Sequence, residues 1–175
     1  GLVSTYIAIY DGYISRHYGV KKMKIPLRKL TRIKRHVMTY EECVHTGLKH
    51  HNDDGFCSVV AMSVACEIAF SRARAIMAKM INRRNRRGTR RTDVLNLLEL
   101  MGYKCEQVYI NSKTLKTAQR ELATTKGAYY LYTRGHVSCV KDGVMQDWAR
   151  SDIRPSNKRI ESVYKITPTN QVIRY

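Results

Sequence analysis

The sequence predicts an α+β domain in which helices come first and an antiparallel sheet follows. Apolar residues recur at helical spacing between residues 57 and 101. After residue 102 the apolar segments become short, rich in β-branched and aromatic residues, and separated by turns. Asp142 and Gly143 form a two-residue turn signal between two such segments, which is typical of a β-hairpin. With 175 residues, the chain is long enough for one domain with a substantial core.

Three helices are expected in the first half of this domain. Residues 57–70 leave almost no polar face, which indicates a helix buried on most sides. A second helix carries one apolar stripe opposite its basic residues, and the stripe consists of Ala73, Ile76, Met77, Met80 and Ile81. The third is marked by Val94, Leu95, Leu98 and Met101. It should stop at Gly102, because glycine readily adopts the left-handed conformation that ends a helix.

The second half is expected to consist mainly of strands. The predicted strands are Tyr103–Ile110, Ala128–Thr133, His136–Lys141, Val144–Trp148 and Val163–Ile166. A short helix, Thr114–Ala123, should lie among them, capped near Asn111 or Ser112. Residues 1–40 are interpreted as a basic N-terminal extension, and residues 41–175 as the folded domain, which opens with a polar loop at 41–56.

The positive charge of the chain is concentrated in two segments. The net charge is +18, and residues 16–35 and 71–91 each hold nine Lys or Arg and no acid. The remaining 14 basic and 14 acidic residues balance. Such segments favour contact with a polyanion, nucleic acid first and an anionic surface next; a solvated charged surface is the alternative. The candidate nucleic-acid contacts are Arg83, Arg84, Arg86, Arg87, Arg90, Arg91, Lys21, Lys22 and Lys24.

The cysteines and the chain start bear on the cellular compartment. Five cysteines without a CxxC pair do not resemble a secreted disulfide framework, so free thiols in a reducing compartment or inside a particle are expected. The first residues, GLVSTYIAIY, lack the features of a signal peptide, and no segment is apolar enough for a transmembrane span.

Cys57 is the candidate nucleophile, because it stands where a glycine-containing loop gives way to an apolar helix. Amide dipoles at a helix start favour a thiolate. A base should come from another element and be oriented by a third group. His136 opens a predicted strand, and Asp147 follows 11 residues later across the Asp142-Gly143 hairpin, which would bring the two side by side. The predicted catalytic residues are therefore Cys57, His136 and Asp147.

This arrangement resembles the papain-like cysteine peptidases, and most closely the bacteriocin-leader peptidase type and its small phage-encoded relatives. The segments that carry the resemblance are Asp54-Gly55-Phe56-Cys57-Ser58-Val59-Val60-Ala61, Gly88-Thr89, Asp93-Val94-Leu95, Gly102-Tyr103, Gly135-His136-Val137 and Asp147-Trp148. The resemblance covers about residues 50–166. It implies a papain-like fold, with N-terminal helices packed on a C-terminal antiparallel sheet. It also implies thiolate attack on an amide carbonyl of a protein or peptide, an acyl-enzyme and hydrolysis. The phage-type resemblance suits a viral protein located in the host cytoplasm or associated with the virion, and no cofactor is expected.

The sequence departs from this family at the oxyanion hole. Papain-like enzymes usually place a Gln several residues before the cysteine, whereas this chain has His50, His51, Asn52, Asp53 and Asp54 there. Asn52 is a candidate oxyanion donor through its amide, and His51 is another if it is protonated. The backbone N–H of Cys57 would be the second donor.

Three alternatives remain open from the sequence. The domain could be a catalytically silent papain-like fold that binds nucleic acid or a partner protein within a virion or another large assembly. The same triad also serves acyl transfer or deamidation. A zinc site is the chemical rival, because Cys43, His45, His50, His51 and Cys57 crowd into fifteen residues. Their spacing matches no familiar zinc pattern, so no metal is expected.

Overall fold

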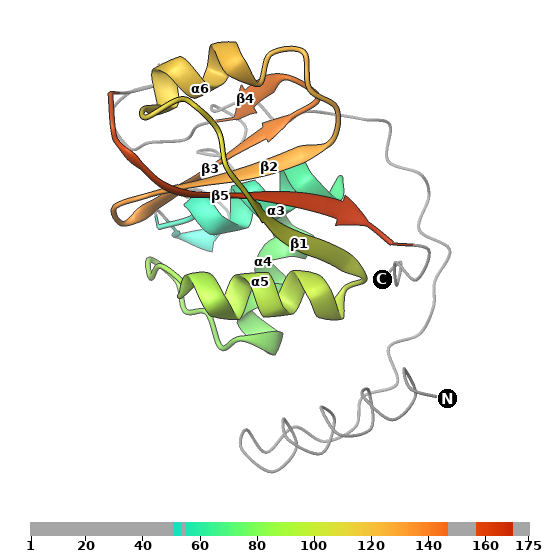
Figure 1. Ribbon diagram of the computed structural model, residues 1–175. Coiled ribbons are helices and arrows are strands. Elements are labelled where there is room, and N and C mark those ends of the chain that lie inside the picture. The colour runs from blue at the N-terminus through green and yellow to red at the C-terminus, as the bar shows by residue number, and fades with distance from the viewer. Residues whose placement is uncertain (1–50, 54, 147–156, 170–175) are drawn as a thin grey trace. The chain divides into compact units, whose positions relative to one another are not determined.

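The computed structural model describes residues 51–53, 55–146 and 157–169. The predicted N-terminal extension, with Lys21, Lys22 and Lys24, lies outside this part of the chain. The helices in the described part are α3 (Cys57–Cys66), α4 (Phe70–Met80), α5 (Arg91–Leu100) and α6 (Leu115–Glu121). The strands are β1 (Tyr103–Val108), β2 (Ala128–Thr133), β3 (His136–Lys141), β4 (Val144–Gln146) and β5 (Ile160–Pro168) (Figure 1).

The five strands form one sheet in the order β1-β5-β2-β3-β4, and every neighbouring pair is antiparallel. This confirms the α+β class. The last described strand, β5, lies between β1 and β2, so β1 joins the sheet only through this C-terminal strand. Strand β5 is also longer than predicted, because its pairing with β2 and β1 continues on both sides of the apolar residues Val163 and Ile166.

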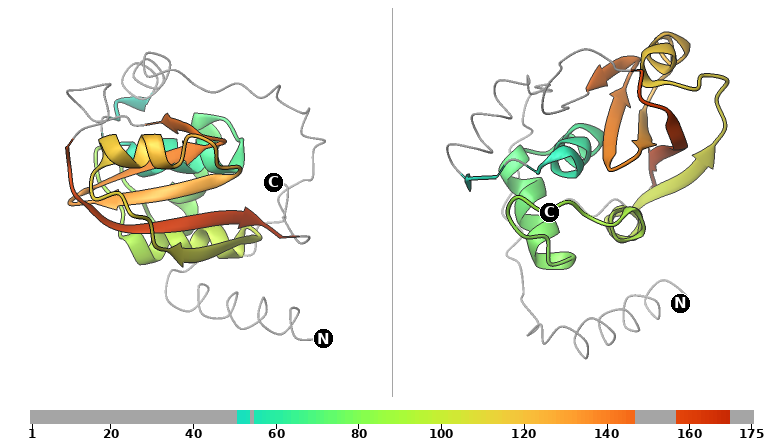
Figure 2. Two further views of the ribbon diagram at one scale, coloured as in Figure 1. Left: turned by 45° about the horizontal axis from the view of Figure 1, so that its top comes forward. Right: turned by 90° about the vertical axis from the view of Figure 1, so that its left-hand side faces the viewer.

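The helices cover both faces of the sheet (Figure 2). On one face, helix α6 packs against the strands. Its residues Leu115 and Ala118, with the C-cap residue Leu122, form one buried apolar cluster with Leu131, Val140 and Val163. On the other face, α3 packs against β2 and β3. Because α3 lies between the sheet and α4, eight of its ten residues are buried, as its apolar sequence predicts.

The predicted helix over 57–70 is wrong as one continuous element. Helix α3 ends at Cys66, Glu67 follows in the left-handed conformation at φ 54°, and α4 begins only at Phe70. The N–H of Glu67 bonds the Ser63 carbonyl, and the Ser63 hydroxyl donates a 2.6 Å hydrogen bond to the Ile68 carbonyl. A serine side chain therefore stabilises a turn that the uninterrupted apolar pattern conceals.

The predicted cap of α6 also needs correction. Thr114 caps the helix, because its hydroxyl accepts a 3.3 Å hydrogen bond from the N–H of Thr117. The N–H groups of Asn111 and Ser112 instead donate to the Glu121 carboxylate at 2.8 and 2.7 Å. The two polar residues therefore belong to the connection between β1 and α6, and the carboxylate at the end of α6 holds that connection in place.

The β3–β4 hairpin confirms the prediction made from Asp142 and Gly143. Both residues have positive φ, 48° and 79°, which a two-residue turn of the primed type requires. A Cβ at Gly143 would also overlap the Ala123 carbonyl, with the carbonyl carbon only 2.8 Å away. The turn therefore packs directly against the end of the α6 segment.

We expect Gly143→Ala to lower the free energy of unfolding by about 3 kcal/mol, from backbone strain together with overpacking. Gly127→Ala is the matched control, because Gly127 also has positive φ, 85°, but open space where its Cβ would lie. That control should lose only about 1 kcal/mol from backbone strain. Urea denaturation measures both, and equal losses would show that the contact with Ala123 has no energetic weight.

Within the described ranges, no helix combines the length and the apolar character needed to cross a membrane.

Candidate active site

Cys57 is the first residue of α3. Its N-cap residue, Phe56, offers no side chain to the free N–H groups of the first helical turn. Phe56 is itself buried and meets Phe70 of α4 edge-on at 5.7 Å between ring centroids. The nucleophile candidate therefore stands at the positive end of a helix dipole, on a helix held in place by its own core contacts.

His136 reaches this cysteine from the sheet. It is the first residue of β3 and pairs with Thr133 across the tight turn of Arg134 and Gly135. Gly135 takes φ 70°, which a glycine adopts without strain. The turn places the His136 side chain in hydrogen-bonding contact with the Cys57 side chain. Two of the three predicted catalytic residues, far apart in the sequence, therefore lie together.

The surroundings of Cys57 favour its thiolate. Burial of the sulfur alone raises the pKa of Cys57, but the hydrogen bond and positive charge of His136 lower it. The backbone N–H groups of Val137 and Ser58 lower it further, and the net pKa lies below the ordinary value of 9.0. The pKa of Cys57 is therefore lowered overall because the imidazole and the backbone amides at the starts of β3 and α3 outweigh the effect of burial.

The other described cysteines show the opposite behaviour. Burial raises the pKa of Cys66 and of Cys105 to about 12 in each case, and raises the pKa of Cys139 well above its usual range. These thiols behave as small hydrophobic groups of the core and of the edge of the sheet. Cys57 is thus chemically distinct from three cysteines in the same fold.

Asp147, the third predicted member of the triad, lies outside the described residues. The pairing of β3 with β4 is described as far as Cys139 opposite Gln146, one residue before it. The hairpin that the prediction requires is therefore present up to that point. The role of Asp147 as the group that orients His136 stays a prediction.

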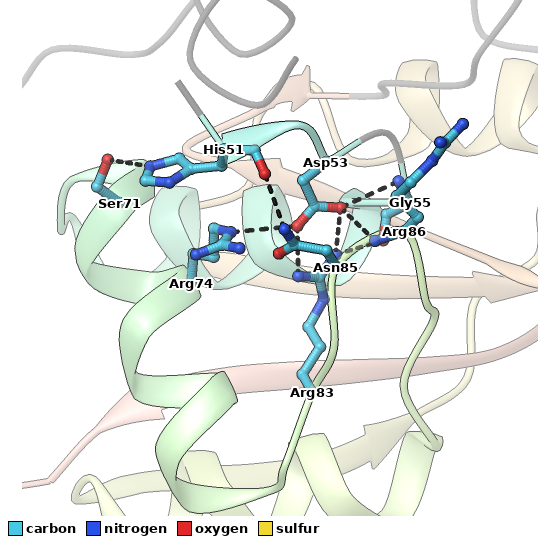
Figure 3. A network of polar contacts seen from close by, with 8 residues as sticks. All are labelled: His51, Asp53, Gly55, Ser71, Arg74, Arg83, Asn85 and Arg86. Atoms are coloured by element: carbon cyan, nitrogen blue, oxygen red, sulfur yellow. Dashed lines mark hydrogen bonds and ion pairs between the residues drawn. The ribbon is translucent and has the colours of Figure 1, made fainter. Parts of the chain in front are cut away.

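A buried carboxylate anchors the loop that leads to Cys57 (Figure 3). Asp53 is fully buried and accepts two hydrogen bonds from Arg83, Nη1 to Oδ2 at 2.6 Å and Nη2 to Oδ1 at 3.0 Å. Oδ1 also accepts from the backbone N–H of Arg86 at 3.0 Å and of Gly55 at 3.3 Å. Oδ2 is 3.3 Å from the Nε of Arg74 on α4. Asp53 thus joins its own loop, helix α4 and the loop that follows α4.

Burial raises the pKa of Asp53, but the bonds from Arg83 and Arg86, the charge of Arg83 and the bond from Gly55 lower it. The net pKa lies below 3.8, so the carboxylate stays ionised at neutral pH. Sequence reasoning missed this residue, because nothing in the pattern separates Asp53 from Asp54 beside it. Its burial and its contacts with Arg83, Arg74 and the Arg86 amide become visible only in the folded chain.

The α4–α5 loop lies directly against the Cys57 loop. A Cβ on Gly55 would lie 2.9 Å from the carbonyl carbon of Arg86, closer than side chains are tolerated. Arg83 also donates to the Gly55 carbonyl at 2.7 Å, and Asn85 donates to the His51 carbonyl at 2.8 Å. Two loops separated by about thirty residues thus come into close backbone contact just before the nucleophile and are joined by side-chain-to-backbone hydrogen bonds.

The two candidate oxyanion donors take different positions. The His51 ring points to α4, where its Nε2 lies 2.9 Å from the Ser71 hydroxyl (Figure 3). The ring also lies tilted against that of Phe70. Asn52 is exposed, with its backbone in the left-handed region at φ 49°. The ring of His51 is therefore tied by a hydrogen bond to a neighbouring helix.

The predicted nucleic-acid contacts fall into two groups. Arg83 is buried against Asp53, and Arg91 bonds Glu161 and Ser162 at 2.8 Å each while its guanidinium lies 4.5 Å from the centre of the Tyr132 ring. The charges of these two arginines therefore serve the fold. The remaining described candidates are exposed on the α4–α5 loop, and they are Arg84, Arg86, Arg87 and Arg90.

For a metal, the described ranges hold no group of three or more His, Cys, Asp or Glu side chains that could bind one. Cys43, His45 and His50 lie outside those ranges. Comparison of the chain with models of known protein families, with curated proteins and with solved structures gave no match.

Proposed function

We propose that this chain is a papain-like cysteine hydrolase that cleaves peptide or related amide bonds through Cys57 and His136. The observation that carries the proposal is the contrast among the thiols. Cys57 contacts an imidazole and has a lowered pKa, whereas burial raises the pKa of Cys66, Cys105 and Cys139. A thiolate paired with a histidine at a helix start is the arrangement that nucleophilic thiol catalysis requires.

The proposed reaction has two steps. The Cys57 thiolate attacks the carbonyl carbon of the scissile amide and forms a C–S bond. The C–N bond then breaks as protonated His136 gives its proton to the leaving nitrogen, which leaves a thioester. In the second step His136 removes a proton from water, and the resulting hydroxide attacks the thioester. The acid is released, and the Cys57 thiolate and the protonated His136 are restored.

Two further roles complete the proposal. Asp147 accepts the second N–H of the His136 ring and fixes its orientation. The backbone N–H of Cys57 stabilises the oxyanion together with a side chain from the preceding loop, for which Asn52 and His51 are the candidates. The proposed substrate is a protein or peptide, and the proposed setting is a viral protein in the host cytoplasm or the virion.

Turnover of p-nitrophenyl acetate tests this function without knowledge of the natural substrate. We expect nitrophenolate release to continue beyond one equivalent, with an acetyl group found by mass spectrometry on Cys57. Cys57→Ser should lower the rate by about 100-fold or more, because a serine hydroxyl lacks the thiolate. Cys105→Ser is the matched control and should leave the rate unchanged. Equal rates in the wild type and Cys57→Ser would contradict the proposal.

The second candidate function is a catalytically silent papain-like fold that binds a polyanion. The exposed arginines of the α4–α5 loop, Arg84, Arg86, Arg87 and Arg90, favour it. Such a fold needs no activated thiol. It therefore predicts that no acetyl group accumulates on Cys57 in the same experiment.

A further inference from the structure

A hollow of about 230 Å³ lies between the end of α4 and the start of α5. We call it the basic pocket; its lining residues are Ile81, Asn82, Arg83, Arg84, Arg87, Gly88, Thr89, Arg90 and Asp93. It is smaller than the roughly 300–1,000 Å³ of pockets that take drug-sized ligands. Its size therefore suits a single side chain or a single small anion.

The lining carries an excess of positive charge. Arg84, Arg87 and Arg90 are exposed, and Asp93 is the one acid among the lining residues. The charge of Arg83 is matched by Asp53, so three arginines against one carboxylate leave an excess of two positive charges. Arginine guanidinium groups bind carboxylates and other oxyanions through charge-assisted hydrogen bonds.

Two further observations point to an anionic ligand. Helix α5 begins at Arg91 without a side-chain cap, and two residues at its start, Arg90 and Asp93, line the pocket. The Nε–H of Arg83, one of the lining residues, is buried and has no hydrogen-bond partner within the described chain. A buried N–H without a partner costs free energy that an acceptor would recover.

The pocket is held at a constant position relative to the nucleophile. Arg83 joins its wall to Asp53 and to the Gly55 carbonyl, and the backbone of Arg86 touches Gly55. Gly55 is two residues before Cys57, so their Cα atoms are at most about 7 Å apart. A group bound in the pocket would therefore lie within a few residues of a peptide bond presented to Cys57.

We propose that the basic pocket is a substrate subsite that binds the carboxylate of a Glu or Asp side chain, so that the enzyme selects acidic peptides. This inference rests on the proposed hydrolase function and names its substrate class. A peptide fits better than a nucleic acid, because nucleic-acid binding relies on several phosphate contacts spread along the backbone. The basic pocket is one small hollow open to solvent, and its lining residue Arg83 bonds the loop that precedes Cys57.

Iodoacetyl peptides test the subsite through the rate at which they alkylate Cys57. Peptides of five residues carry one Glu, or a matched Gln, at each position in turn among alanines. We expect the Glu peptide to react about ten-fold faster than its Gln partner in at least one position at low salt, the gain of a charge-assisted hydrogen bond. The preference should fall as salt concentration rises.

Arg84→Gln and Arg87→Gln should each remove the preference, so that Glu and Gln peptides react at nearly the same rate. Both side chains are exposed, so neither variant endangers folding. Arg120→Gln is the matched control, because Arg120 lies on α6 at the opposite face of the sheet, and it should keep the preference.

The outcomes separate the two proposals. Rapid alkylation of Cys57 by iodoacetamide without a Glu preference would overturn the subsite and leave the nucleophile standing. A Cys57 that reacts no faster than the buried thiols would overturn both. If Arg84→Gln and Arg87→Gln weaken binding of a DNA duplex but keep the Glu preference, the pocket serves nucleic acid, and the subsite is again overturned.

Discussion

At pH 6, iodoacetamide is expected to alkylate Cys57 at least about 30-fold faster than Cys66 or Cys105. The pKa of Cys57 lies below 9.0 and the others lie at about 12, so the thiolate fractions differ by more than about 1,000-fold. A more basic thiolate is intrinsically more nucleophilic. With a Brønsted slope of about 0.5, the thiolates of Cys66 and Cys105 react roughly 30-fold faster than that of Cys57, which reduces the expected rate advantage of Cys57 to about 30-fold. Site-by-site mass spectrometry of a time course measures all these rates in one sample.

His136→Ala should remove most of this advantage. Without the imidazole, burial dominates, and the pKa of Cys57 should rise, because only the backbone N–H groups of Val137 and Ser58 still lower it. The alkylation rate at pH 6 should fall by about 10-fold or more, and the pH at which the rate is half-maximal should move upward. Cys105 in the same sample is the internal control, since its rate should not change.

Two results would contradict this prediction. One is a Cys57 that reacts at the rate of Cys105 across the pH range. The other is a fast Cys57 whose rate is unchanged in His136→Ala, because the helix start alone would then account for its reactivity. Repeating the reaction in denaturant, where all thiols should react alike, excludes a difference in peptide detection.

Asp53→Asn is expected to lower the free energy of unfolding by about 3–5 kcal/mol. The substitution keeps the shape of the side chain, but it leaves the Arg83 guanidinium as an uncompensated charge that is only 1% exposed. The Asn side chain can keep one oxygen for the Arg86 and Gly55 amides, but its NH₂ group then faces the Arg83 and Arg74 donors that Oδ2 accepts in the wild type. Urea denaturation at pH 7 measures the loss.

The double variant Asp53→Asn/Arg83→Met separates charge from packing. Removing both charges should recover a large part of the stability, since a buried ion pair contributes less than the penalty for breaking it. Glu106→Gln is the matched surface control, because Glu106 pairs with Lys104 while both side chains are more than half exposed; it should change stability by less than about 0.5 kcal/mol. A small loss for Asp53→Asn would show that the Arg83 charge is not buried in solution.

The contribution of Asp53 to stability should also depend on pH in a defined direction. The folded-state pKa of Asp53 is lowered below 3.8, so its contribution is complete above that pH and is lost as the pH falls through the lowered value. The stability difference between the wild type and Asp53→Asn should therefore be constant above about pH 5 and narrow in more acidic solution.

The local sequence alone was sufficient to predict most strands of the sheet. The ranges Ala128–Thr133 and His136–Lys141 were predicted with the boundaries that the structure has, because short runs of β-branched and aromatic residues separated by a two-residue turn specify strands locally. The break after Cys66 was not predictable in this way. It depends on a single serine hydroxyl that reaches a carbonyl five residues away.

For the candidate site, the sequence by itself determined which thiol to examine and the α+β order of the elements around it. The position of Cys57 at a helix start and of His136 after a tight turn are local features, readable from neighbouring residues. Only the tertiary structure decided how the arginines are used. Arg83 and Arg84 are neighbours of identical chemistry, yet one is buried against Asp53 and the other lines an exposed pocket. That difference depends on a carboxylate thirty residues away, and no local pattern encodes a contact of that separation.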